Sequence, residues 1–141
     1  MRFAWPADIL EEEDGITVTF PDVPGAITWG QTRSEALAKA SDALVSVLSS
    51  MIEDGEAIPP ASAADGRPMV SVAPLDAAKI ALHVTMLAKG ISNVELGRLM
   101  NADEKAIRRL RDPLHGSHIE KVDRALHILG RRLEVLVLED A

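Results

Sequence analysis

The sequence predicts an α+β protein, in which a strand-rich region precedes a helical one. Residues 1–31 hold short runs where apolar and polar residues alternate, as they do in half-buried strands. Beyond residue 31, apolar residues recur mainly at three- and four-residue spacing, which is typical of one face of a helix. Apolar residues make up 47% of the 141, enough to build a core. The predicted order is three strands, a helix, a strand and then a group of helices.

The charge is spread unevenly, which supports two predicted domains, 1–74 and 75–141. Residues 1–74 hold 4 Lys and Arg against 12 Asp and Glu, a net charge of −8. Residues 75–141 hold 11 against 10, a net charge of +1. The total of −7 therefore describes neither half, and local patches decide what each half can bind.

Composition excludes several classes of protein. The chain has no cysteine, so disulfides and thiolate metal sites are excluded and a reducing compartment is compatible. No apolar run approaches the roughly 18 residues that a membrane-spanning helix needs. The N-terminus lacks the basic start and apolar stretch of a secretion signal. We therefore expect a cytoplasmic protein without a membrane anchor.

Three strands are predicted at the start of the chain. The first covers residues 3–9, where Pro6, which has no N–H, places the strand at an edge or a bulge. A charged turn over 11–15 leads to a second strand, 16–20, in which apolar side chains alternate with threonine. A turn rich in proline precedes a third strand, 26–30. Because adjacent carboxylates on a flexible turn make a poor cage for a cation, the acidic turn is read as a solvated loop.

The clearest predicted helix covers residues 32–54. Thr32 and Glu35 form a capping box at its start. Its apolar residues at helical spacing are Leu37, Ala40, Leu44, Val47, Leu48 and Met51. Such a face should pack across the sheet. A loop rich in Pro, Ala and Gly over 56–68 then leads to a short strand, 69–73, that can rejoin the sheet.

Residues 92–111 predict two short helices joined by a tight turn, behind a leading helix over 75–89. Ser92 opens the first helix with a capping box, and Asn101 can end it because Asn tolerates the left-handed conformation. Gly97 is expected to leave room for a neighbouring helix. The residues predicted to be buried on the first helix are Leu96, Leu99 and Met100.

The second short helix is strongly basic. Asp103 can cap it, and the Asp-Pro pair at 112–113 stops it. It exposes four cations within seven residues, Lys105, Arg108, Arg109 and Arg111. A short basic helix delivered by a tight turn is the layout of a DNA-reading helix-turn-helix. The plainer alternative, a helical hairpin with a solvated basic face, stays open on residue pattern alone.

The expected DNA contacts fall into two sets. Those expected in the major groove or at its rim are Lys105, Arg108 and Arg109. Those expected to hold phosphates are Arg111, Ser117, His118 and Lys121. A third capping box, from Ser117 to Glu120, would open the next helix and add its dipole near the phosphates.

The sequence predicts no metal site, no cofactor and no catalysis. His115 and His118 lie close together, but no third zinc ligand is visible. Asp8 is the only acidic residue well inside a predicted strand, so converging nuclease carboxylates are not evident. A metal-dependent nuclease is therefore the weakest of the functions considered.

The tail, residues 132–139, is β-prone and mostly apolar. A single strand after a helical region has no partner there, and an exposed apolar edge would aggregate. We predict that it pairs with the same strand of a second chain in a two-fold dimer, through Leu133, Val135 and Val137. The alternative is that it folds back onto the first domain. A dimer would place two reading helices at half-sites about one DNA turn apart.

The segment DGITVTFPDVPG, from Asp14 to Gly25, resembles the signature of the HicB antitoxin family. The supporting positions are Gly30, Thr32, Glu35-Ala36, Glu53-Asp54-Gly55-Glu56 and Pro59-Pro60. This resemblance implies that residues 1–74 form a partial ribonuclease-H-like β-β-β-α-β domain that has lost catalysis. The second half resembles the helix-turn-helix domain, similar to the lambda-repressor class, that many HicB proteins carry.

The resemblance also implies a partner and a function. HicB antitoxins neutralise HicA, a small basic toxin that cleaves RNA, and an acidic first domain suits a basic partner. The residues expected to contact the toxin are Asp22, Pro24, Gly25, Thr28 and Trp29. The expected function is an antitoxin that also represses its own operon. The main alternative is a stand-alone regulator whose first domain senses a small molecule.

Overall fold

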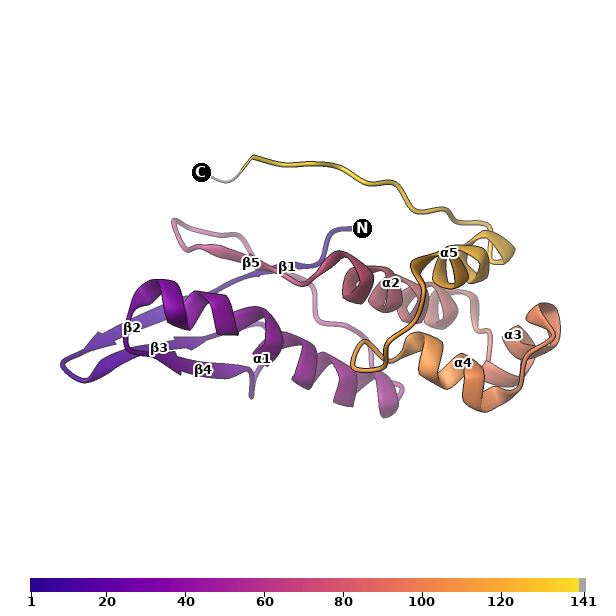
Figure 1. The fold of residues 1–141 in the computed structure, drawn as a ribbon, viewed down its shortest axis with the longest axis horizontal. Coiled ribbons are helices and arrows are strands. Elements are labelled where there is room, and N and C mark those ends of the chain that lie inside the picture. The colour runs from indigo at the N-terminus through magenta and orange to yellow at the C-terminus, as the bar shows by residue number, and fades with distance from the viewer. Residues whose placement is uncertain (140–141) are drawn as a thin grey trace.

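The strands in the first part of the chain form two small antiparallel sheets, one with two strands and one with three (Figure 1). The computed structural model describes residues 1–139. The strands are β1 (Ala4–Pro6), β2 (Asp8–Glu12), β3 (Gly15–Thr19), β4 (Ile27–Gly30) and β5 (Met69–Ser71). β1 pairs with β5, and the other sheet has the order β2-β3-β4. Only Ala7 separates β1 from β2, so the predicted first strand is interrupted directly after Pro6.

The long helix α1 (Arg33–Glu53) covers one face of the three-stranded sheet. The predicted capping box is confirmed, because the Thr32 hydroxyl accepts from the Glu35 N–H at 3.1 Å and the Glu35 carboxylate accepts from the Gln31 N–H. The buried residues of its inner face are Ala36, Ala40, Leu44, Val45, Leu48, Ser49 and Ile52. β4 reaches the helix so closely that a Cβ on Gly30 would lie 2.5 Å from the Ala36 nitrogen. Glycine is therefore required where the sheet meets the helix.

Within residues 1–139, four further helices follow in the second part of the chain. They are α2 (Pro74–Lys89), α3 (Asn93–Met100), α4 (Glu104–Arg111) and α5 (Ile119–Ile128). Helix α2 contributes to both apolar cores: Ile80 lies in the core with α1 and the strands, and Leu82 lies in the core with α3, α4 and α5. The α+β class is confirmed. The predicted boundary between residues 74 and 75 falls in the first turn of this shared helix.

The predicted turn between the two short helices is present. Asn101 has φ 53° and ψ 48°, the left-handed conformation expected of it, and Asp103 caps α4 by accepting from the Ala106 N–H at 2.7 Å. Gly97 serves this turn rather than a neighbouring helix. Its carbonyl accepts from the Ala102 N–H at 2.8 Å, and a Cβ on Gly97 would lie 2.5 Å from the Ala102 oxygen.

Two local predictions in this part were wrong. Leu99, expected inside, is 60% exposed, because the buried face of the eight-residue α3 turns Leu96 and Gly97 inward instead. The third capping box is absent: α5 begins at Ile119, and its N-cap, His118, makes no side-chain cap hydrogen bond. The Ser117 hydroxyl accepts from the buried Lys79 ammonium instead.

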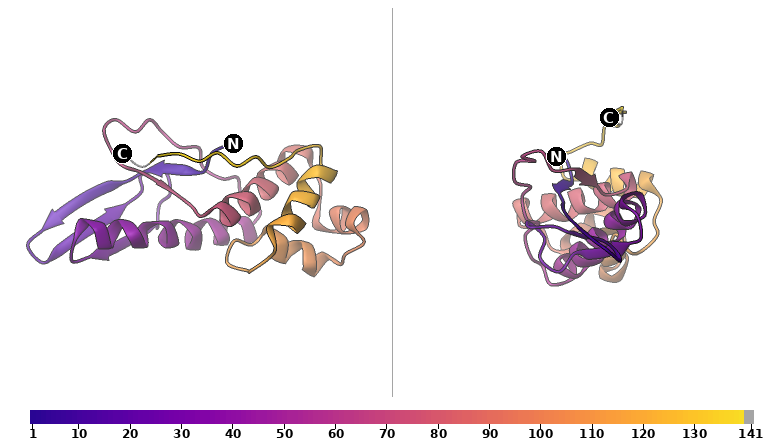
Figure 2. Two further views of the ribbon diagram at one scale, coloured as in Figure 1. Left: turned by 45° about the horizontal axis from the view of Figure 1, so that its top comes forward. Right: turned by 90° about the vertical axis from the view of Figure 1, so that its left-hand side faces the viewer.

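The tail extends from α5 without pairing with any described strand (Figures 1 and 2). Leu133 packs against the helical core, and its N–H donates to the Asp123 carboxylate at 3.3 Å. Beyond it, Val135 and Val137 are 85% and 88% exposed. The predicted partner strand from a second chain therefore stays a prediction, and the single chain leaves this apolar segment uncovered up to residue 139.

Candidate nucleic-acid and protein interfaces

The exposed face of α4 carries three of the predicted DNA-binding residues, Lys105, Arg108 and Arg109. The Arg108 guanidinium pairs with the Glu104 carboxylate at 2.8 Å, one helical turn earlier. Hydrogen bonds from Arg108 and then from Asn93 lower the pKa of the Glu104 carboxyl. An exposed pair of this kind contributes little to stability. Arg108 can therefore exchange this partner for a phosphate or a base edge.

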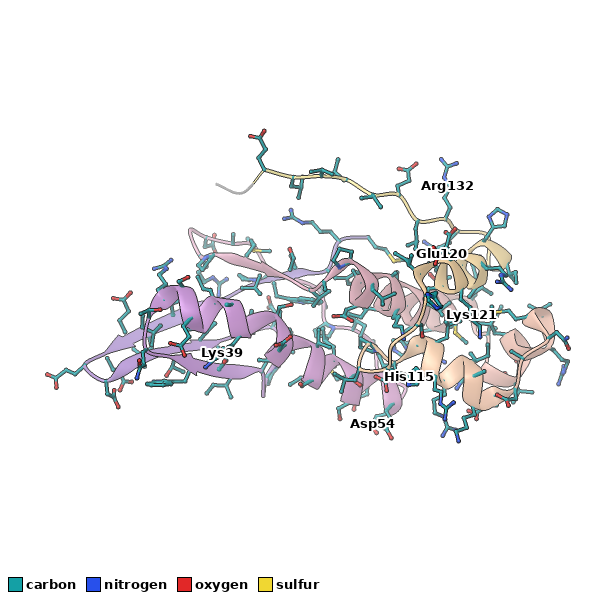
Figure 3. All side chains as sticks on the ribbon, in the orientation of Figure 1. Lys39, Asp54, His115, Glu120, Lys121 and Arg132 are labelled. Atoms are coloured by element: carbon teal, nitrogen blue, oxygen red, sulfur yellow. The ribbon has the colours of Figure 1, made fainter. Side chains whose placement is uncertain are left out.

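The remaining predicted DNA contacts divide into two groups. His118 and Lys121 are exposed at the start of α5, and Figure 3 shows Lys121 together with His115 on the helical part of the molecule. Arg111 and Ser117 are turned inward instead, and their polar atoms contact other parts of this chain. The structure thus brings five of the seven residues to the surface around α4 and the start of α5.

A buried lysine, which the sequence pattern did not single out, organises the end of α4. Lys79 of α2 is fully buried, and its ammonium donates to the carbonyls of Arg109 at 3.1 Å and Asp112 at 3.0 Å. The His115 carbonyl and the Ser117 hydroxyl are also within hydrogen-bonding reach of this ammonium. Because an ammonium has three N–H groups, one of them is shared between two of the four acceptors. The last carbonyls of a helix lack intrahelical partners and carry partial negative charge, which favours a cation there. Burial lowers the pKa of Lys79, and the charges of Asp112 and Asp76 oppose that shift.

Arg111 lies in a second buried arrangement, also centred on α2. Its guanidinium donates to the Asn93 side-chain oxygen at 2.7 Å and to Nδ1 of His83 at 2.5 Å. Because a guanidinium can only donate, Nδ1 of His83 must be unprotonated. Nε2 then carries the proton and donates to the Glu56 carbonyl at 2.7 Å. The contact between α2 and the segment after α1 therefore requires the neutral form of His83.

This geometry predicts a loss of stability at mildly acidic pH. Burial lowers the pKa of His83 below 6.5; the hydrogen bond to the Glu56 carbonyl opposes the shift, and the Arg111 charge adds to it. The unfolded chain takes up a proton as the pH falls through about 6.5, whereas the folded chain takes it up only at lower pH. The contribution of His83 is thus complete above about pH 6.5 and is lost progressively below it. Urea unfolding between pH 7 and pH 5.5 should show a smaller decrease for His83→Gln than for wild type; equal decreases would contradict the assignment.

The outer face of the three-stranded sheet is not covered by α1 (Figure 1). Residues directly opposite each other in antiparallel strands share a face, so the pairing separates an inward row through Ile9 and Val18 from outward rows through Leu10 and Ile27. Leu10, Ile27 and Trp29 are 58%, 60% and 44% exposed. The Trp29 ring lies against Gly15, where a Cβ would clash with it. Large apolar side chains thus gather on one open sheet face.

Only some of the predicted toxin contacts lie on or near that face. Trp29 lies on it, and Pro24 and Gly25 are exposed in the turn before β4. Thr28 is opposite the fully buried Val18 and so belongs to the inward row. The Asp22 carboxylate accepts from the N–H and the hydroxyl of Ser62, both at 2.9 Å, and so holds the 56–68 loop.

Leu10 and Ile27 were not named individually among the predicted toxin contacts. The sequence signal for Ile27 was its position two residues before Trp29 in one predicted strand, which places both on the same face. Within residues 1–139, no three His, Asp or Glu side chains gather as metal ligands would. In the same residues, no helix is long and apolar enough to cross a membrane.

Comparison with known proteins identifies the class of protein. Residues 4–81 match the HicB-like antitoxins of bacterial toxin-antitoxin systems. The chain is 40% identical to Antitoxin HicB 2 of Photorhabdus laumondii over 95% of this chain and 96% of that protein. It is 35% identical to Antitoxin HicB of Pseudomonas fluorescens, covering 94% and 92%, and 33% identical to Antitoxin HicB of Escherichia coli K12, covering 89% and 92%. The chain belongs to the HicB family of antitoxins.

Proposed function

We propose that this antitoxin neutralises a HicA-type, RNA-cleaving toxin with its first domain and represses its own operon with α3 and α4. The observation that carries the DNA-binding half is the exposed cationic face of α4, presented by the left-handed turn at Asn101. A major groove admits a helix of this size, and arginine can bond a guanine edge through two parallel hydrogen bonds. His118 and Lys121 would then contact phosphates. No catalytic step is part of this function.

The open sheet face supports the toxin-binding half of the proposal. Tryptophan is enriched among the residues that dominate the energy of a protein interface, and a contiguous exposed apolar patch marks an interaction surface. Leu10, Ile27 and Trp29 would form its centre, with Pro24 and Gly25 beside it. The net charge of −8 over residues 1–74 would attract a basic toxin and increase the rate of encounter. Asp22 and Thr28 would act indirectly, by holding the loop and the core.

A two-fold dimer completes the proposal. The exposed tail offers an unpaired apolar strand, and pairing with its copy would cover Val135 and Val137. Dimers of helix-turn-helix proteins address two half-sites about one DNA turn apart. We place both activities in the cytoplasm, where the operator and the toxin's RNA substrate are found.

The test combines co-purification with a promoter gel shift. The chain should co-purify with the product of an adjacent small gene and should shift a duplex carrying its own promoter. The double variant Arg108→Ala/Arg109→Ala should weaken DNA binding by at least about thirtyfold while the partner still binds, because each arginine contact contributes about 1–3 kcal/mol and two are lost.

A matched control separates contact from total charge. Arg33→Ala/Lys39→Ala removes two cations from exposed positions of α1 and should leave the shift unchanged. A shift with no partner would make the chain a lone repressor. Equal loss of DNA binding in both double variants would mean that α4 is not the reading helix.

A further inference from the structure

The last turn of α4 is connected to the first domain by a short, buried hydrogen bond. Ser49 lies on the inner face of α1 and is 7% exposed, and its hydroxyl donates to the Asp112 carboxylate at 2.6 Å. The two residues are 63 positions apart in sequence. The same carboxylate oxygen accepts from the Leu114 N–H at 2.9 Å and so also fixes the start of the loop after α4. Hydrogen bonds to an ionised acceptor are shorter and stronger than neutral ones.

A series of side-chain contacts also connects the first domain to the exposed basic face of α4, which carries Lys105, Arg108 and Arg109. From the Glu56 carbonyl it passes through His83, Arg111, Asn93 and Glu104 to Arg108. Apolar packing alone holds α4 weakly, because only two of its eight residues, Ile107 and Leu110, are buried. Polar contacts at its C-terminal end therefore have a large share in setting its orientation.

We propose that Ser49 and Asp112 are positioning residues for operator binding, because they fix the orientation of α4 relative to α1 of the first domain. The proposal rests on the function proposed above and adds a dependence of DNA affinity on a residue far from the DNA. A two-point hydrogen bond between arginine and a base edge tolerates little displacement, so a small rotation of α4 weakens binding. The contact also gives the first domain a physical route to the reading helix.

Ser49→Ala tests this directly, and the chain provides a matched control. The Ser46 hydroxyl, one turn earlier in α1, donates only to the Asp42 carbonyl of its own helix. Affinity for a fluorescent promoter duplex is measured by anisotropy at a temperature where circular dichroism shows every variant folded. Ser49→Ala should bind about three- to tenfold more weakly than wild type, in the range measured for coupling between distant sites, and Ser46→Ala should bind as wild type does.

Asp112 allows a conservative rescue. Asp112→Ala removes the acceptor and should weaken binding at least as much as Ser49→Ala, whereas the side-chain oxygen of Asp112→Asn can accept both hydrogen bonds and should restore most of the affinity. The double variant Ser49→Ala/Asp112→Ala should be no weaker than Asp112→Ala alone, because both changes remove one interaction. A purely structural role would lower the unfolding temperature without this pattern in the affinity of the folded protein.

The outcomes separate the two proposals. A folded Ser49→Ala that binds as tightly as wild type overturns the positioning role and leaves the proposed function intact. An Asp112→Asn that is as weak as Asp112→Ala also overturns it. A wild-type chain that fails to bind its promoter overturns the proposed function and this inference together.

Discussion

Lys79→Met is expected to lower the free energy of unfolding by about 3–5 kcal/mol, because it removes an ammonium whose three N–H groups serve four acceptors at the end of α4. Methionine keeps an unbranched apolar side chain, one atom shorter than that of lysine, and has no donor. The Arg109 and Asp112 carbonyls and the Ser117 hydroxyl would lose their hydrogen bonds at 3.1, 3.0 and 2.8 Å. Each buried acceptor left without a donor costs about 1–3 kcal/mol. Acceptors near the exposed loop can turn to water, which keeps the total below the simple sum.

Urea unfolding at pH 7 measures this effect. Lys89→Met is the matched control, since Lys89 lies in the last turn of the same helix but is exposed. The control should change the free energy of unfolding by less than about 0.5 kcal/mol. A Lys79→Met variant as stable as this control would show that the end of α4 holds its conformation without the ammonium.

The second large effect is expected at the tail. Deleting residues 132–141 should convert the proposed dimer to a monomer and weaken operator binding by about a hundredfold or more. The reason is that one chain would reach only one half-site, and linked binding adds a factor of about 10²–10⁴ without new contacts. Light scattering after gel filtration gives the mass, and anisotropy on the promoter duplex gives the affinity.

A pair of substitutions tests the same point without shortening the chain. Val135→Asp/Val137→Asp places charges on one face of the tail and should also give a monomer. Glu134→Gln, which loses only an exposed ion pair with Arg132 at 3.3 Å, should remain dimeric. A truncated chain with the wild-type mass would place the dimer interface elsewhere or exclude it.

The parts of this fold that sequence predicted well are those set by neighbouring residues. The caps at Thr32, Ser92 and Asp103 and the left-handed Asn101 each depend on atoms within four positions along the chain. Residue type and spacing are sufficient there, because the competing conformations are also local. The basic face of α4 was found by the same kind of pattern.

The long-range contacts could not be predicted in this way. Lys79 looked like an ordinary helix lysine, since its acceptors lie 30 to 38 positions further along the chain. The same contact explains why the capping box predicted at Ser117 is absent. The Ser117 hydroxyl accepts from Lys79 instead of capping α5. Arg111 was predicted to contact DNA because it is a cation on α4. Its guanidinium instead points to His83, 28 positions away in the sequence. Residue type and local spacing therefore predict which interactions a side chain can make, but tertiary packing determines which partner it contacts.

The sharing of α2 between the two cores has a consequence for how the chain loses its structure. Ile80 and Leu82, two positions apart, are fully buried in different cores. Unfolding α2 removes buried side chains from both cores. Neither half therefore keeps its full apolar core once the other half has unfolded. Heat or denaturant should therefore disrupt both halves in a single cooperative transition, and a protease that captures the opened state would gain access to both at once. Turnover of the chain would then end toxin binding and operator binding together, without a half-active fragment in between.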